Sequence, residues 1–175
     1  MALRPPQPHE ILLPVKAGFI AATLVVALLA NLLPWSGVVL WIKPDFLAVT
    51  LLYWCIHQPR KLGFAAAWLL GLAMDIGDAS LFGQHALAYT LLVYAGITLH
   101  RRVLMFSIKH QVLHVVPLLL LAQLATLVVR MAAGADFPGL LYFTASFTGA
   151  ALWPLFVLVL KLPQQPRLDP EHPAI

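Results

Sequence analysis

The stretch LLGLAMDIGDASLFGQHAL, residues 69–87, joins two apolar runs through a short segment that contains Asp75, Asp78 and His85. Two apolar runs that meet at a turn predict a hairpin of helices. Ionisable side chains are costly inside an apolar bundle, and there they usually have a partner or a function. This hairpin therefore indicates both the expected fold and the first candidate site.

The composition of the chain predicts an integral membrane protein. Of its 175 residues, 61% are hydrophobic and only 10% are charged, and the mean hydropathy is +0.87. A soluble domain carries roughly 25% charged residues. The chain has one cysteine, Cys55, so neither an intramolecular disulfide nor a cysteine-rich metal site can form.

Six apolar runs predict an all-α membrane protein with six transmembrane helices. The lengths of the runs are close to the length of helix that crosses a hydrocarbon core of about 30 Å. The runs are continuous, whereas the residues of transmembrane strands alternate between apolar and polar. They span residues 16–33, 39–57, 62–76, 82–99, 111–131 and 140–160.

Residues 1–15 and 161–175 are predicted to be disordered cytoplasmic tails on either side of a transmembrane bundle over 16–160. Each tail contains four prolines and few residues that could be buried. Neither tail is long enough for a soluble domain with its own core. Function is therefore expected in the bundle and its short loops.

Lysine and arginine are distributed unequally between the two sides of this predicted bundle. With a cytoplasmic N-terminus, nine of them lie on the inner side, and only Lys43 and Arg130 lie on the outer side. Positive residues concentrate on the cytoplasmic side of membrane proteins, so both termini are expected there. This basic edge is expected to contact anionic lipid, and it requires no nucleic acid. Its central residues are Arg60, Lys61, Arg101 and Arg102.

Asp75 is expected to lie below the outer surface, because the helix from Lys61 to Asp75 rises only about 21 Å. Steps of four along this helix pass through small residues before they reach the carboxylate. Small residues let a neighbouring helix approach closely, which places Asp75 at a helix interface beside a polar dimple. The residues expected to allow close packing are Gly63, Ala67, Gly71 and, in the turn, Gly83.

Arg130 is the expected partner of Asp75, because about 30 Å of helix from His110 brings it to the same level. Two roles stay open for this pair: it locks the bundle, or it binds a ligand or a partner directly. Asp78 is expected to be a turn residue or the N-cap of the fourth helix. His85 is expected to be a hydrogen-bonded interface residue rather than a ligand or a proton relay.

No pattern in the chain predicts catalysis. The stretch HQVLH, residues 110–114, lacks the glutamate of a zinc-protease motif. Neither a Gly-x-Ser-x-Gly elbow nor a phosphate-binding loop occurs. We therefore expect no enzymatic activity, no bound metal and no cofactor.

A series of residues between the second and the sixth apolar run agrees with one family in residue type and spacing. The series is Pro44-Asp45, Leu52-Tyr53-Trp54, Pro59, Gly63, Gly71, Asp75, Gly83, Ala86-Leu87 and Trp153-Pro154. With six spans and this length, the chain resembles the MreD family of bacterial rod shape-determining membrane proteins. The agreement is densest over residues 44–87, although Phe82 stands where the family more often has leucine.

The resemblance implies an inner-membrane protein of the cell-elongation machinery, which supports lateral peptidoglycan synthesis and rod shape without a known enzymatic activity. The implied partners are MreC, the glycosyltransferase RodA with its penicillin-binding protein, and MreB and RodZ. We expect Asp75, Arg130 and Asp45 to shape the outer face that receives MreC. The family fold is similar to the membrane substrate-binding component of energy-coupling factor (ECF) transporters, so the alternative function is a vitamin-type transport component.

Overall fold

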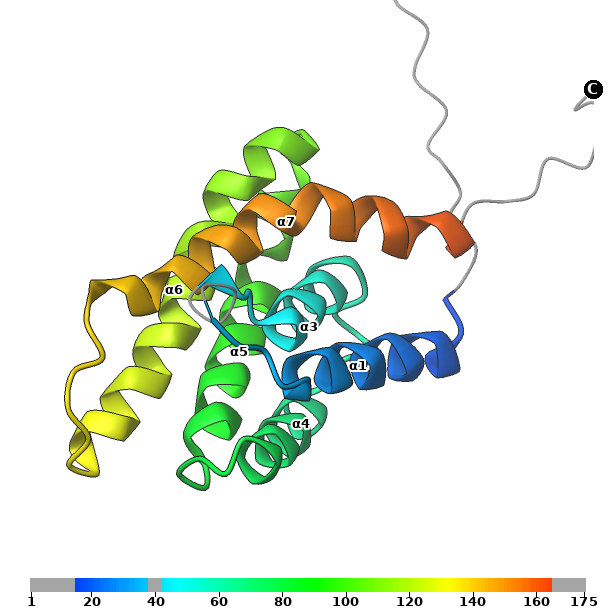
Figure 1. Cartoon of the computed structure of the whole chain (residues 1–175). Helices are drawn as coiled ribbons and strands as arrows, with labels where there is room; N and C mark the ends of the chain where they lie inside the picture. The colour runs from blue at the N-terminus through cyan, green and yellow to red at the C-terminus, as the bar shows by residue number, and fades with distance from the viewer. Residues whose placement is uncertain (1–14, 38–41, 165–175) are drawn as a thin grey trace, which may run out of the picture.

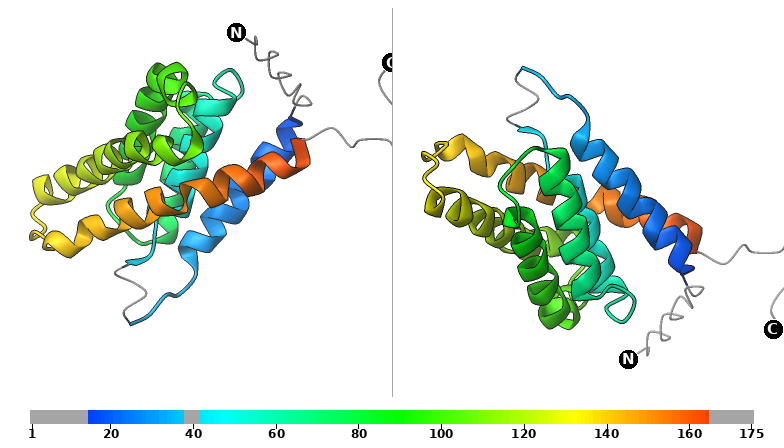
Figure 2. Two further views of the ribbon diagram at one scale, coloured as in Figure 1. Left: turned by 90° about the horizontal axis from the view of Figure 1, so that it is seen from above. Right: turned by 90° about the horizontal axis from the view of Figure 1, so that it is seen from below.

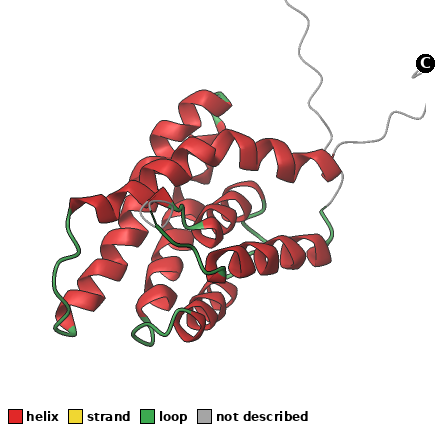
Figure 3. Ribbon diagram, viewed as in Figure 1, coloured by secondary structure: helices red, strands yellow, loops and turns green. Residues whose placement is uncertain are grey.

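The computed structural model describes residues 15–37 and 42–164. Within these two ranges the chain forms helices and no strand (Figures 1 and 3). Short 3-10 helices span Leu140–Phe143 and Leu162–Gln164. The α-helices are α1 (Ala17–Leu32), α3 (Phe46–His57), α4 (Phe64–Gly77), α5 (Gln84–Leu104), α6 (Ile108–Ala132) and α7 (Thr144–Lys161). Each of the six apolar runs thus contains an α-helix, which confirms the all-α prediction.

Two helical segments in the described ranges are long and apolar enough to cross a membrane. They are Ile108–Ala132 and Leu140–Gln164. The helices α1, α3 and α4 are also apolar but shorter. That all six helices span the membrane stays a prediction from the sequence pattern.

The helix α3 begins at Phe46, so the prediction of one continuous helix from about residue 39 is wrong at residues 43–45, which are not helical. Residues 38–41 lie outside the described ranges. Pro44 has no N–H to donate and disfavours a helical conformation in the residue before it. Asp45 then caps α3, because its carboxylate accepts a 2.9 Å hydrogen bond from the Ala48 N–H.

The ordered bundle extends slightly beyond its predicted limits of 16–160. Val15 is buried, and its carbonyl oxygen accepts a hydrogen bond from Nζ of Lys61. At the other end, Gln164 is buried and donates from Nε2 to the Tyr53 hydroxyl at 3.2 Å. The remainder of both predicted tails, residues 1–14 and 165–175, lies outside the described residues.

The helix α3 forms the centre of the bundle. All of its residues from Leu47 to Ile56 are buried, and it packs against α1, α5, α6 and α7. A helix that is apolar on every side is stable only where other helices cover it. The later helices pack as successive neighbours, α4 on α5, α5 on α6 and α6 on α7.

Antiparallel packing separates the two ends of the bundle. At the basic end, both ends of the described chain lie side by side (Figure 2). Arg60, Lys61, Arg101 and Arg102 are exposed at the same end, in the α3–α4 connection and the last turn of α5. At the opposite end, α1, α4 and α6 finish and α3, α5 and α7 begin. We call this the polar end, because Asn31, Asp45 and Asp75 lie there.

The close packing of α4 occurs against α5 and centres on Gly71. A Cβ atom at Gly71 would lie 2.3 Å from Cα of Ala86, and Ala67, one turn earlier, is fully buried. The packing role predicted for Gly63 and Gly83 is wrong, since a Cβ atom at either would meet no described neighbour within 4 Å. Gly63 is the N-cap of α4, and Gly83 adopts a left-handed φ of 99° in the turn before α5.

Candidate functional site

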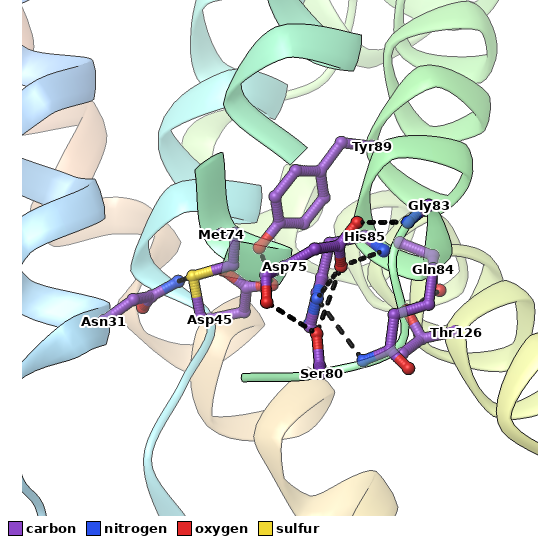
Figure 4. Close-up of polar contacts among 11 residues, drawn as sticks. Asn31, Asp45, Met74, Asp75, Ser80, Gly83, Gln84, His85, Tyr89 and Thr126 are labelled. Carbon is purple, nitrogen blue, oxygen red and sulfur yellow. Dashed lines mark hydrogen bonds and ion pairs between the residues drawn. The ribbon is translucent and has the colours of Figure 1, made fainter. Parts of the chain in front are cut away.

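The Asp75 carboxylate holds together the turn between α4 and α5 (Figure 4). Its side chain is fully buried and accepts hydrogen bonds from the backbone N–H groups of Gly83 at 2.7 Å and His85 at 2.9 Å. It also accepts from the Ser80 hydroxyl at 3.2 Å and from Nδ1 of His85 at 2.8 Å. One carboxylate therefore satisfies four donors of a single turn, which are costly to leave unpaired in an apolar surrounding.

Asp75 also supplies the cap that α5 lacks. The N-cap of α5 is Gly83, which has no side chain to accept from the first N–H groups of the helix. A carboxylate from the preceding helix does so instead, and its charge is favourable at a helix N-terminus. Asp78 is not the N-cap, so that alternative is wrong. Asp78 lies in the turn immediately after α4, as the other alternative predicted.

The predicted pair of Asp75 and Arg130 is wrong, because the ion pair of Asp75 in the described ranges is with His85, at 2.8 Å. The arrangement of the helices explains the difference. α4 packs against α5 and α1, whereas α6, which carries Arg130, packs against α5, α7 and α3. The guanidinium group of Arg130 instead lies beside the hydroxyl group of Tyr142.

Asp45 is the centre of a second set of hydrogen bonds at the polar end. Besides capping α3, it accepts from Nδ2 of Asn31 at 2.7 Å and from the Tyr89 hydroxyl at 2.8 Å. The buried Asn31 accepts from the Phe46 N–H at 2.9 Å, and its carbonyl oxygen accepts from Lys43 at 2.5 Å. Asp45 therefore ties the end of α1 to the beginnings of α3 and α5.

Gln123 links α6 to α7 by hydrogen bonds, as Asp45 links α1, α3 and α5. Its Nε2 donates to the carbonyl oxygen of Tyr142 at 2.5 Å, and its Oε1 accepts from the Ser146 hydroxyl at 2.5 Å. Gln123 and Asn31 were not among the predicted site residues. The available signal was an amide side chain inside an otherwise apolar run, because such side chains commonly hydrogen-bond across helices in membrane bundles.

A cavity of about 520 Å³ opens between these two sets of hydrogen bonds. Its lining carries both signs of charge, with Lys43 and Arg130 opposed by Asp45 and Asp78. Asp78 is exposed, and its carboxylate forms no hydrogen bond or ion pair with any residue in the described ranges. Asp75 does not line the cavity. It contacts His85, which does line the cavity, and so holds that part of the wall in position. The polar dimple was predicted on the α4–α5 hairpin, from which this cavity takes only Met74, Asp78, His85 and Tyr89.

Ser80 and His85 do not have the arrangement of a serine nucleophile and its base. Ser80 and His85 both hydrogen-bond to Asp75 and not to each other. A serine nucleophile requires the base beside its hydroxyl, with the acid behind the base. Among the described residues, no group of three His, Cys, Asp or Glu side chains could hold a metal ion.

We expect Tyr89→Phe to lower the free energy of unfolding by about 1.5–3 kcal/mol, because it removes a buried hydrogen bond to a carboxylate. Tyr89 is only 1% exposed and packs beside the His85 ring, and phenylalanine retains that packing. The matched control is Tyr94→Phe on the same helix, where the tyrosine is 61% exposed. Thermal unfolding of both variants in detergent tests this, and equal transitions would contradict it.

The chain is similar in sequence to known proteins of one family. The family model described as rod shape-determining protein MreD matches residues 15–163. A curated Rod shape-determining protein MreD from Haemophilus influenzae is 28% identical over 145 residues, which cover 82% of this chain and 90% of the relative. No solved structure matches the chain.

Proposed function

The chain belongs to the MreD family of rod shape-determining proteins, and on this premise we propose that it is a non-enzymatic scaffold of the bacterial cell-elongation machinery. In this proposal it lies in the inner membrane as a multi-pass protein with both termini in the cytoplasm. It supports rod shape and lateral peptidoglycan synthesis through MreC and through RodA with its penicillin-binding protein. MreB and RodZ act with the same assembly, directly or through these partners.

The observation that carries the proposal is the charged cavity at the polar end. In the proposed orientation it faces the periplasm, where the membrane-proximal part of MreC would meet it. Asp75 and Asp45 fix its walls through hydrogen bonds within the bundle, while Arg130 and Asp78 contribute charges that form no ion pair with described residues. Preformed walls reduce the ordering cost of association, and opposed charges favour one orientation of the partner.

The basic end has a separate role in this proposal. Arg60, Lys61, Arg101 and Arg102 are exposed there and would face the cytoplasm. Exposed lysine and arginine beside a membrane attract anionic lipid headgroups and acidic protein surfaces. The scaffold would thus present a periplasmic face to MreC and a cytoplasmic face to lipid or to the cytoskeletal partners.

We expect Arg130→Ala to reduce co-purification of MreC at least tenfold, because a half-buried arginine in a cavity is the kind of residue that dominates association energy. Expression of this variant in depleted cells should then give wide or round cells. The control for capture of MreC is Arg101→Ala, which removes the same side chain at the opposite end. Full capture of MreC and normal cell width with Arg130→Ala would remove the cavity from the proposal.

The volume of the cavity favours one alternative, a vitamin-type substrate-binding component of a transporter. Small-molecule sites commonly occupy about 300–1,000 Å³ and combine apolar walls with a few polar groups. Depletion of the protein separates the two functions. Rounding with loss of lateral wall insertion supports the scaffold, whereas unchanged rods with a growth defect that a vitamin rescues support the transporter.

A further inference from the structure

A second hollow lies on the side of the bundle, between α1 and α7, and does not belong to the polar end. It encloses about 450 Å³, and its floor is formed by Phe46 and Thr50 of α3. In Figure 1, α1 and α7 run toward the ends of the described chain with α3 between them. We call this hollow the α1/α7 groove. The walls are Phe19, Ala22, Thr23, Val26, Ala27 and Ala30 of α1 and Leu155, Phe156, Val159 and Leu160 of α7.

The groove offers contacts to an apolar occupant only. Its two hydroxyl groups already have partners within the bundle: Thr50 donates to the Phe46 carbonyl oxygen at 2.8 Å, and Thr23 donates to Ile20 at 2.8 Å. Thr23 also accepts from Nε1 of Trp54 at 2.9 Å. No polar atom of the lining is therefore left to recognise a hydrophilic molecule, and the remaining walls are aliphatic and aromatic.

The length of the groove matches an acyl chain in one leaflet of a bilayer. The lining of α1 extends from Phe19 to Ala30, which corresponds to about 16 Å of helix. This is close to half of a hydrocarbon core of about 30 Å, which is the depth that one leaflet occupies.

The groove ends between two lysines at the basic end. Lys16 precedes Phe19 by less than one turn of helix, and Lys161 directly follows Leu160. Neither forms an ion pair with a carboxylate among the described residues. Lysines at the edge of an apolar surface extend their ammonium groups toward the headgroup region, where they attract negative charge.

We propose that the α1/α7 groove binds one acyl chain of an anionic phospholipid, whose phosphate lies against Lys16 and Lys161. The apolar walls of the groove complement the acyl chain, and the two lysines at its basic end complement the phosphate. This site is separate from the cavity at the polar end, and it does not depend on the identity of the partner that the cavity receives.

Native mass spectrometry of the full chain in detergent tests the proposal, with phosphatidylglycerol and phosphatidylcholine of identical acyl chains as probes. We expect one phosphatidylglycerol per chain, retained at least tenfold better than phosphatidylcholine. Val26→Trp should abolish this binding, because the indole fills the groove. Val25→Trp is the matched control, since Val25 is 50% exposed, Val26 is 65% exposed, and only Val26 lines the groove.

The double variant Lys16→Gln, Lys161→Gln should reduce retention of phosphatidylglycerol to the level of phosphatidylcholine, while Lys109→Gln at the same end should not change it. Equal retention by the Val25→Trp and Val26→Trp variants would overturn the proposal, as would equal retention of the two lipids by the natural chain. A dimer, or a co-purified partner helix, that Val26→Trp displaces would also overturn it by assigning the groove to a protein.

Discussion

We expect Asp75→Ala to lower the free energy of unfolding by about 3–5 kcal/mol, because each buried donor left without its acceptor costs about 1–3 kcal/mol. The alanine leaves the Gly83 and His85 N–H groups, the Ser80 hydroxyl and the His85 ring without their acceptor. No other side chain caps α5, because its N-cap is a glycine. The turn and the first residues of α5 should then loosen, together with the wall of the cavity that His85 forms.

Thermal unfolding in detergent measures this loss, and the control is Asp136→Ala. Asp136 is an exposed aspartate at the same end of the bundle, so its removal should change the free energy of unfolding by less than about 0.5 kcal/mol. A further variant, Asp78→Asn, separates the stability of the bundle from the capture of MreC, because Asp78 lines the cavity. It should unfold like the natural chain, because the Asp78 carboxylate holds no part of the bundle. If Asp75→Ala unfolds like Asp136→Ala, the capping role assigned to Asp75 is wrong.

Gly71→Ala should destabilise the bundle by about 3 kcal/mol, the upper part of the range for overpacking. The added Cβ atom would lie 2.3 Å from Cα and 2.5 Å from N of Ala86, and both are backbone atoms that no change of rotamer can move. α4 and α5 must therefore separate. Separation would also displace the neighbouring His85 from Asp75, so capture of MreC should fall together with stability.

The control for Gly71→Ala is Gly18→Ala in α1. Both glycines lie inside helices, but a Cβ atom at Gly18 would meet no described atom within 4 Å. The higher helix propensity of alanine should leave the Gly18 variant unchanged or more stable by up to about 1 kcal/mol. Thermal unfolding of the two variants checks the prediction, and a similar transition temperature for both would contradict a close approach of α4 and α5.

The positions of the helices could be predicted because the signal for them is local. An apolar run of helical length forms a helix that lipid or other helices must bury on all sides. The breaks between the runs consist of charged residues, glycine and proline. The start of α3 at Phe46 was also encoded locally, since aspartate is a typical N-cap and Pro44 disfavours a helical conformation in the residue before it. Its misplacement near residue 39 came from following hydropathy past Pro44.

The roles of single polar residues were harder to predict. Asp75 was expected to have a partner, because a buried carboxylate requires one, and its partners are the donors of the following turn. Arg130 lies at a suitable height along its own helix, but height along a helix does not say which helices are neighbours. With α5 between α4 and α6, the donors nearest to Asp75 come from the turn that follows it.

The sequence by itself determined an apolar all-helical chain of the MreD family, with polar residues concentrated at the ends of its helices. Tertiary structure alone decided which of these residues meet. Asn31 of α1, Tyr89 of α5 and Asp45, the N-cap of α3, close one wall of the cavity together. The physical reason is that the two kinds of interaction depend on residues at different separations along the chain. Helix periodicity depends on neighbours within a few turns, whereas a hydrogen bond needs two atoms within about 3 Å, and only the packing of the helices sets that distance.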